Sequence, residues 1–96
     1  MGMGPNRWSD HVSQDVLDAI DSERAYQKKL WPGHEEPDNP LTIGEFLLLI
    51  EQYSSIAREE WTKEAKPELR TLEVFRKIAA IAVNCMEQHG ALKRQA

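Results

Sequence analysis

The chain has 96 residues, a formal net charge of −4, and 41% hydrophobic and 29% charged residues. This length allows a single small domain, and this composition is typical of a soluble globular protein rather than a disordered or membrane-embedded one. The acidic balance argues against a partner that is a nucleic-acid polymer, because binding along DNA or RNA requires many cations that neutralise phosphates.

No apolar run approaches the roughly 20 residues that a membrane span needs, so no membrane partner is expected. The first residues lack the charged start and apolar core of a secretory signal, and Asn6 stands where a myristoylation motif requires Ser or Thr. A cytoplasmic location is therefore expected. The single Cys85 excludes an internal disulfide and leaves no cysteine pair for a zinc site.

The first predicted element is a helix over residues 10–30, preceded by a flexible lead over residues 1–8. Ser9 and Asp10 are suitable N-cap residues, and an apolar stripe with a helical period follows them. Glu23, Arg24, Gln27 and Lys28 share one surface band of this helix. Pro32 and Gly33 end it, and residues 32–40 form a surface loop.

The second predicted element is a long helix over residues 41–64. Thr42 and Glu45 have the spacing of a capping box, in which each side chain bonds a backbone N–H at the helix start. The helix should pack through a stripe at steps of three and four residues. That stripe comprises Phe46, Leu49, Ile50, Tyr53 and Ala57.

Glu51 is expected at the margin of this stripe, with Ser55 and Arg58 on the same side of the helix. A carboxylate in such a place is partly removed from water and needs a partner, because an unpaired charge outside water is costly. The alternatives are a metal ion, an arginine such as Arg58 or Arg76, or a hydrogen-bond donor from another helix.

The third predicted element is a helix over residues 68–88 that Gly90 terminates. Leu72, Phe75, Ala79, Ala82 and Met86 form its expected packing face, and its small alanines permit close approach of another helix. No strand is predicted. The fold class is therefore all-α: a single domain over residues 9–91 that contains an antiparallel hairpin or bundle of three helices, with a frayed basic tail over 92–96. Because the apolar faces are wider than one short helix can cover, we expect a homo-oligomer, a dimer or a tetramer, to complete the core.

Two kinds of site are compatible with the polar residues. Mg²⁺ would require converging carboxylates, for which Glu51, Glu73 and Glu87 are the candidates. Phosphate would instead be bound by arginine forks and a lysine, with an aromatic side chain available to stack on a base. The candidate ligand-binding residues are Arg24, Gln27, Trp31, Glu51, Ser55, Arg58, Arg76, Lys77 and Asn84.

Four phrases of the sequence resemble the small MazG-like proteins of phages and bacteria. They are ERAYQ at residues 23–27, LWPG at 30–33, LTIGEF at 41–46 and RKIAAIAV at 76–83. This resemblance implies an all-α fold and, in typical members, Mg²⁺-dependent hydrolysis of nucleoside triphosphates to monophosphate and pyrophosphate at a site between the helices of a dimer or tetramer.

The residues at the family's two metal-binding motifs differ from the pattern. Where the first motif has two adjacent glutamates and a third three residues on, this chain retains only Glu51. Where the second has an aspartate three residues after a glutamate, Arg76 follows Glu73. An arginine repels Mg²⁺ where a carboxylate attracts it.

The resemblance and these departures predict a MazG-like protein that binds or sequesters a nucleotide or cyclic nucleotide second messenger without a cofactor and with little turnover. In a phage, such a binder would act as an anti-defence sponge. One alternative is an active Mg²⁺-dependent nucleoside triphosphate pyrophosphohydrolase. The other is a helical module that binds a protein.

Overall fold

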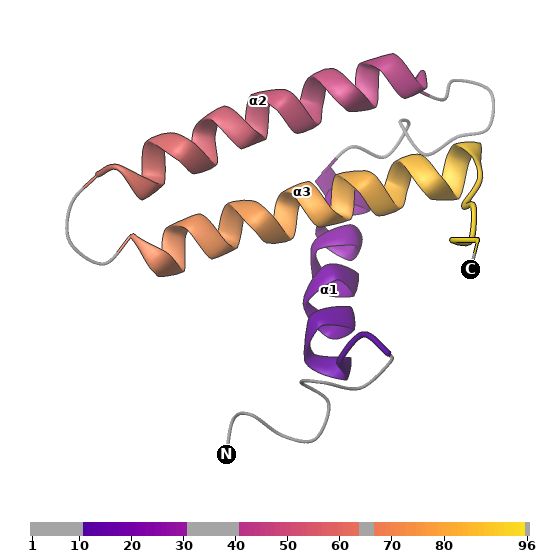
Figure 1. Cartoon of the computed structure of the whole chain (residues 1–96), viewed down its shortest axis with the longest axis horizontal. Helices are drawn as coiled ribbons and strands as arrows, with labels where there is room; N and C mark the ends of the chain where they lie inside the picture. Colours follow the sequence, from indigo (N-terminus) through magenta and orange to yellow (C-terminus); the bar gives the residue numbers. More distant parts are fainter. Residues whose placement is uncertain (1–10, 31–40, 64–66, 96) are drawn as a thin grey trace.

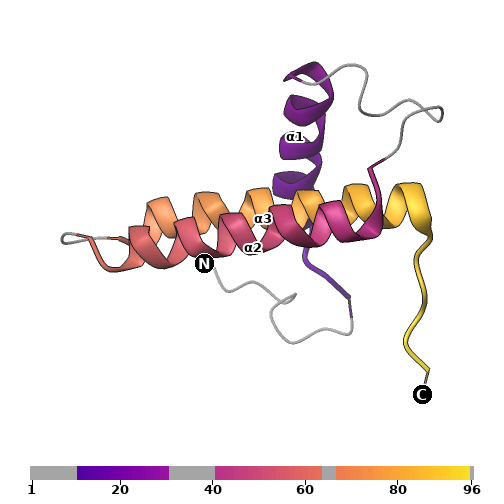
Figure 2. The same cartoon turned by 90° about the horizontal axis from the view of Figure 1, so that it is seen from above.

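The computed structural model describes residues 11–30, 41–63 and 67–95, and these residues form three α-helices. α1 spans Gln14–Leu30, α2 spans Ile43–Trp61 and α3 spans Glu68–His89. The described ranges contain no strand, so the all-α prediction is confirmed. α2 and α3 lie side by side as an antiparallel hairpin, and α1 crosses behind α3 (Figure 1, Figure 2).

The predicted start of the second helix is confirmed. Thr42 is the N-cap of α2: its Oγ1 accepts a bond of 3.0 Å from the backbone N–H of Glu45, and the Glu45 side chain accepts one of 2.8 Å from the backbone N–H of Thr42. The end of α2 comes earlier than predicted, at Trp61, with Thr62 as the C-cap; its N–H donates to the carbonyls of Arg58 and Glu59. The capping box thus fixes where the hairpin begins.

The start of α1 was predicted too early. Residues 11–13 are not helical, and Ser13 occupies the cap: its Oγ accepts from the N–H of Val16 at 3.3 Å, and its carbonyl accepts from the N–H of Leu17 at 3.1 Å. Ser9 and Asp10 lie outside the described residues. The hydroxyl of Ser13 therefore accepts from a backbone N–H of the first helical turn that has no partner within the helix.

The predicted end of α3 at Gly90 is confirmed. Gly90 has a φ of 117°, which side chains other than hydrogen rarely allow, and its N–H donates to the carbonyl of Met86 at 2.8 Å. Residues 91–95 continue without regular secondary structure. The glycine lets the chain leave the helix axis after His89.

The apolar core of the hairpin is small. Phe46 is 1% exposed and is the one large side chain that is fully buried in the described chain. The predicted stripe of α2 is confirmed as its packing face, since Phe46 and Ala57 are buried and Leu49, Ile50 and Tyr53 are half-buried. The remaining buried apolar residues, all on α3, are Val74, Ala80 and Ile81.

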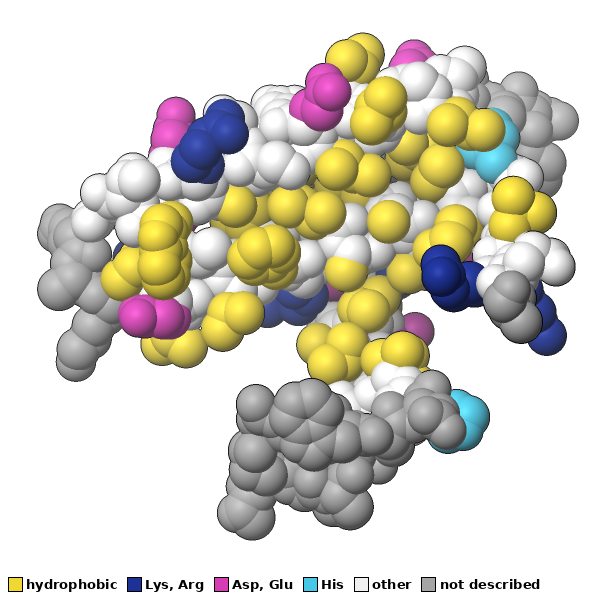
Figure 3. All heavy atoms as spheres, viewed as in Figure 1, with side chains coloured by type: hydrophobic (Ala, Val, Ile, Leu, Met, Phe, Trp, Pro, Cys, Tyr) yellow, Lys and Arg dark blue, Asp and Glu magenta, His cyan; other side chains and the backbone are white. Residues whose placement is uncertain are grey.

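The predicted packing face of α3 is wrong for this chain. Leu72, Phe75 and Met86 are exposed, whereas the face that meets α2 carries Thr71, Val74 and Ile81. The sequence offers two apolar stripes on this helix, and α2 covers only one of them. The other joins exposed side chains of α2 in a surface that we call the open face, visible as the broad yellow band in Figure 3. The open face comprises Trp61, Leu72 and Phe75, which line one groove, and the exposed Ile43, Leu47 and Met86, which continue the same helical rows at steps of three and four.

The partly buried position predicted for Glu51 is also wrong, because this side chain is exposed. α3 contacts the side of α2 that carries Phe46 and Ala57, and Glu51 lies away from that contact. Its carboxylate is therefore hydrated and needs no protein partner.

Among the described helices, none combines the length and hydropathy required to cross a membrane.

Candidate ligand-binding site

All three helices contribute to a cavity of about 540 Å³ beside the point where α1 meets α3. Its size lies within the range of typical small-molecule sites. Most of its wall is apolar, supplied by the first half of α2 and by Ile81 of α3. The polar residues and tyrosines that line it are Glu23, Tyr26 and Gln27 from α1, Glu45, Gln52 and Tyr53 from α2, and Lys77 and Asn84 from α3.

Polar side chains, rather than an apolar stripe, hold α1 against α3. Glu23, Arg24 and Gln27 are buried, which corrects the prediction that they belong to a solvated surface band. Val16 and Leu17, two apolar residues of this helix, are exposed. At the crossing α3 presents Ala80, which is fully buried and small enough for the helices to approach closely.

Arg24 forms the first of two ion pairs across this crossing. Its Nη2 and Nε lie 2.8 and 3.2 Å from Oε1 of Glu87, and its Nη1 donates to Oε1 of Gln27 at 3.2 Å. The Arg24 side chain is 5% exposed, whereas that of Glu87 is 54% exposed. This arginine, which the sequence assigned to a ligand phosphate, therefore makes contacts that join α1 to α3.

Arg76 and Glu23 form the second ion pair. Nε of Arg76 donates to Oε1 of Glu23 at 2.8 Å, and the carboxylate of Glu23 is almost entirely buried. The acidic partner of Arg76 thus belongs to α1, and not to α2 as the sequence suggested with Glu51. The two pairs have opposite polarity: α1 supplies the acid, Glu23, in one pair and the base, Arg24, in the other.

Three residues predicted to bind a ligand do meet in the cavity: Gln27, Lys77 and Asn84. Asn84 is buried and its Oδ1 accepts from Nε2 of Gln88 at 2.9 Å. Lys77 is half-buried and has no ion pair or hydrogen bond within the described chain. It is the cationic side chain among the lining residues, which makes it the natural contact for an anionic group.

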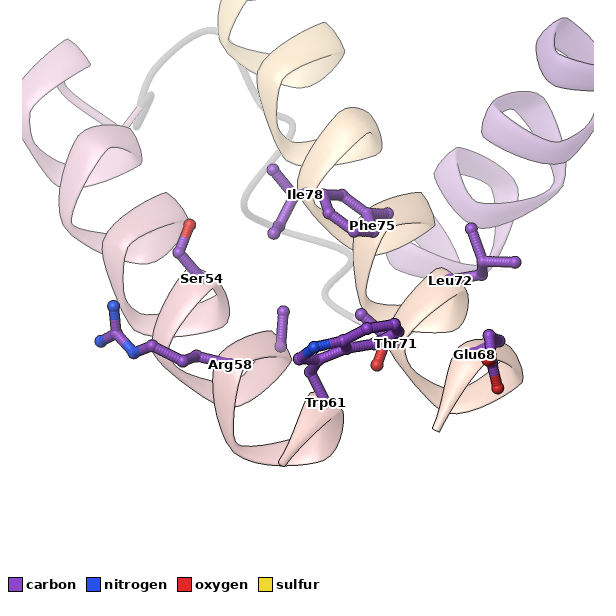
Figure 4. A pocket seen from close by; sticks show the side chains of 9 residues that line it. Ser54, Arg58, Trp61, Glu68, Thr71, Leu72, Phe75 and Ile78 are labelled. Atoms are coloured by element: carbon purple, nitrogen blue, oxygen red, sulfur yellow. The ribbon is translucent and has the colours of Figure 1, made fainter. Parts of the chain in front are cut away.

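Arg58 and Trp61 lie elsewhere, in an apolar groove of about 490 Å³ at the turn end of the hairpin, shown in Figure 4. The groove opens on the open face, and its floor includes Thr71 and Phe75. Arg58 and Glu68 stand at its margin and supply its charges. Its wall is therefore suited to apolar side chains more than to a nucleotide.

The other predicted site residues do not join the cavity. Glu51 and Glu73 are exposed, and Ser55 is half-buried without lining the cavity. Trp31 lies outside the described residues.

The proposed magnesium carboxylates are not gathered in the described part of the chain. No group of three His, Cys, Asp or Glu side chains there has a metal-binding arrangement, and Glu87 is occupied by Arg24. Within the described chain, Glu51, Glu73 and Glu87 are therefore not brought together as shared oxygen ligands of one Mg²⁺.

Three polar lining residues were not among the predicted ligand contacts: Glu23, Glu45 and Gln52. A signal for Glu23 was present in the sequence, because the first helix has too few apolar residues to dock by hydrophobic contact alone. The adjacent charges of Glu23 and Arg24 were available for pairing with opposite charges on the third helix. Which charges of the first helix would be buried depends on partners more than 50 residues along the chain, Arg76 and Glu87.

Neither a protein-family model, nor a curated protein, nor a solved structure matches this chain. Function is therefore argued from the site.

Proposed function

We propose that this protein binds a nucleotide or a cyclic nucleotide in the three-helix cavity, and that it sequesters this ligand without hydrolysing it. The observation that carries the proposal is the combination of Lys77 with apolar walls and amide side chains in one cavity of about 540 Å³. A phosphate would lie at the ammonium group, a ring against the apolar wall, and the amides would orient the ligand. In a phage, removal of a signalling nucleotide in this way would counter host defence.

Tyr26 and Tyr53 support the same proposal. Both line the cavity, one from α1 and one from α2, and Tyr26 remains exposed enough to cover a ring that enters. Aromatic faces bind nucleobases with little dependence on base identity, and each stacked base is worth about 1–3 kcal/mol. Trp61, the other aromatic candidate of the described chain, lines the groove instead.

The test is a panel of nucleoside triphosphates, monophosphates and cyclic dinucleotides, added at 1 mM or roughly 100 times an assumed Kd. We expect at least one to raise the melting temperature by several degrees in the presence of EDTA, since bound ligand at that excess stabilises the native state by about 2.7 kcal/mol. Chromatography of the mixture after incubation with Mg²⁺ should recover the ligand unchanged. Release of pyrophosphate would instead establish the hydrolase, and absence of any thermal shift would refute the binder.

The proposal includes a homo-oligomer formed through the open face. In the described chain five apolar residues are buried, whereas the six large side chains of the open face are exposed. Contiguous apolar surface on this scale is typical of protein interfaces. Arg58 and Glu68 flank the groove with opposite charges. A two-fold axis through this face can therefore place Arg58 of one copy beside Glu68 of the other.

Light scattering coupled to size exclusion tests this assembly. At micromolar concentration we expect a mass of at least twice the 11.0 kDa of one chain. Phe75→Glu with Leu72→Glu should yield monomers, because burying two carboxylates in an apolar interface is costly. The control is Leu48→Glu, which places one carboxylate at an exposed leucine on the cavity side of α2. A wild-type monomer would contradict the proposal.

The protein-interaction alternative rests on the same open face. If pull-downs recover a second protein that competes with self-association, and no nucleotide binds, the open face rather than the cavity is the functional site.

A further inference from the structure

The side chains of Glu23 and Gln27 present one acceptor and one donor to the cavity, and neither group is satisfied within the described chain. Both residues are buried and lie four positions apart on α1, so they share one helical face. Both line the cavity.

The contacts of Gln27 determine which end of its amide faces the cavity. Arg24 donates to Oε1 of Gln27, and an arginine side chain has donors only, so the amide oxygen must face Arg24. The NH₂ group therefore points away from Arg24, and it has no hydrogen-bond acceptor in the described part of the chain. Because Gln27 lines the cavity, a ligand that enters can supply an acceptor for this donor.

The contacts of Glu23 similarly leave one oxygen available. Oε1 accepts from Nε of Arg76 at 2.8 Å, which holds the carboxylate in place. Oε2 has no donor among the described residues. Glu23 lines the cavity, and an N–H of a ligand that enters would be a strong partner for this oxygen.

From this arrangement we infer that Glu23 and Gln27 read the edge of a nitrogen heterocycle that carries an N–H donor beside an acceptor, as the pairing edge of a nucleobase does. Oε2 of Glu23 accepts from the ring or amino N–H, and Nε2 of Gln27 donates to the adjacent ring nitrogen or carbonyl. Lys77 lies on the facing helix and binds the phosphate of the same ligand. The inference rests on the proposed nucleotide-binding function and adds to it the part of the ligand that is recognised and the residues that recognise it.

Titration calorimetry with the 5′-monophosphates of adenosine, guanosine, cytidine and uridine, in EDTA, tests this inference. The tightest of the four is compared with ribose 5-phosphate and with its analogue methylated at the pairing-edge nitrogen. We expect the methylated analogue to bind at least tenfold more weakly and ribose 5-phosphate at least a hundredfold more weakly, because each loses contacts that Glu23 and Gln27 make. Equal binding of the parent nucleotide and its methylated analogue would overturn the inference and leave the nucleotide-binding proposal intact.

Gln27→Glu is the sharpest variant, because a carboxylate can still accept from Arg24 while the ligand-facing donor is lost. We expect it to weaken the parent nucleotide at least tenfold with little change in melting temperature. The matched control is Gln14→Glu, which makes the same change on α1 at an exposed residue that does not line the cavity. Unchanged affinity in Gln27→Glu would overturn the inference. If none of the four monophosphates binds, the inference falls together with the nucleotide-binding proposal for these ligands.

Discussion

Replacing Arg76 by methionine is expected to lower the free energy of unfolding by about 2–4 kcal/mol. The substitution keeps the aliphatic stem and removes the guanidinium, so Glu23 is left with a buried carboxylate and no countercharge. Breaking one side of a buried ion pair costs about 3–5 kcal/mol, and the partial exposure of Arg76 reduces that figure. Urea unfolding at fixed protein concentration measures the change.

Two further variants separate this ion pair from general effects of removing an arginine. Adding Glu23→Gln to Arg76→Met should recover most of the lost stability, because the buried charge is then gone as well. Arg58→Met, at an exposed position, should change stability by less than about 0.5 kcal/mol. Equal losses in Arg76→Met and Arg58→Met would show that the pair does not hold α1.

Replacing Phe46 by alanine is expected to cost about 3–5 kcal/mol, the range observed for large aromatic residues in cores. Phe46 is almost fully buried, and its ring meets the edge of the His89 ring at a centroid distance of 6.1 Å. His89 in turn lies 2.6 Å from the carbonyl of Leu41 through Nε2, so the start of α2 and the end of α3 are joined at this point. In a domain of this size the loss corresponds to a fall of at least about 12 °C in Tm.

The matched control for Phe46→Ala is Leu48→Ala, two residues further along α2 at a side chain that is 65% exposed. Its effect on thermal unfolding should stay below about 1 kcal/mol. If both variants unfold at the wild-type temperature, Phe46 does not anchor the core. Because Phe46 also lines the cavity, its loss should weaken ligand binding as well.

Local signals in the sequence were sufficient to predict the three helices and the face of α2 that packs in the hairpin. The Thr42 and Glu45 capping box and the terminator Gly90 act within a few residues, so their effects are readable from spacing. The stripe from Phe46 to Ala57 likewise identifies the packing face of α2, because its residues recur at steps of three and four.

The position of α1 and the composition of the cavity were not readable in the same way. Arg24 and Glu87 are 63 residues apart, and Arg76 and Glu23 are 53 apart, so no local pattern reports either pair. α3 carries two apolar stripes of similar quality, and the choice between them depends on which helix arrives at which side. Glu51 was consequently assigned a partly buried role that the packing of α2 does not give it.

The central claim is that the three-helix cavity binds the nucleotide. Its most direct test is calorimetric titration of a nucleotide that binds the wild-type protein into the variants Lys77→Ala and Arg58→Ala. The two variants remove one cation each, from the three-helix cavity and from the groove at the turn end of the hairpin. If the cavity is the site, Lys77→Ala weakens binding at least tenfold, about 1.4 kcal/mol, and Arg58→Ala leaves it within about twofold. Loss of binding in Arg58→Ala with wild-type affinity in Lys77→Ala would contradict this account.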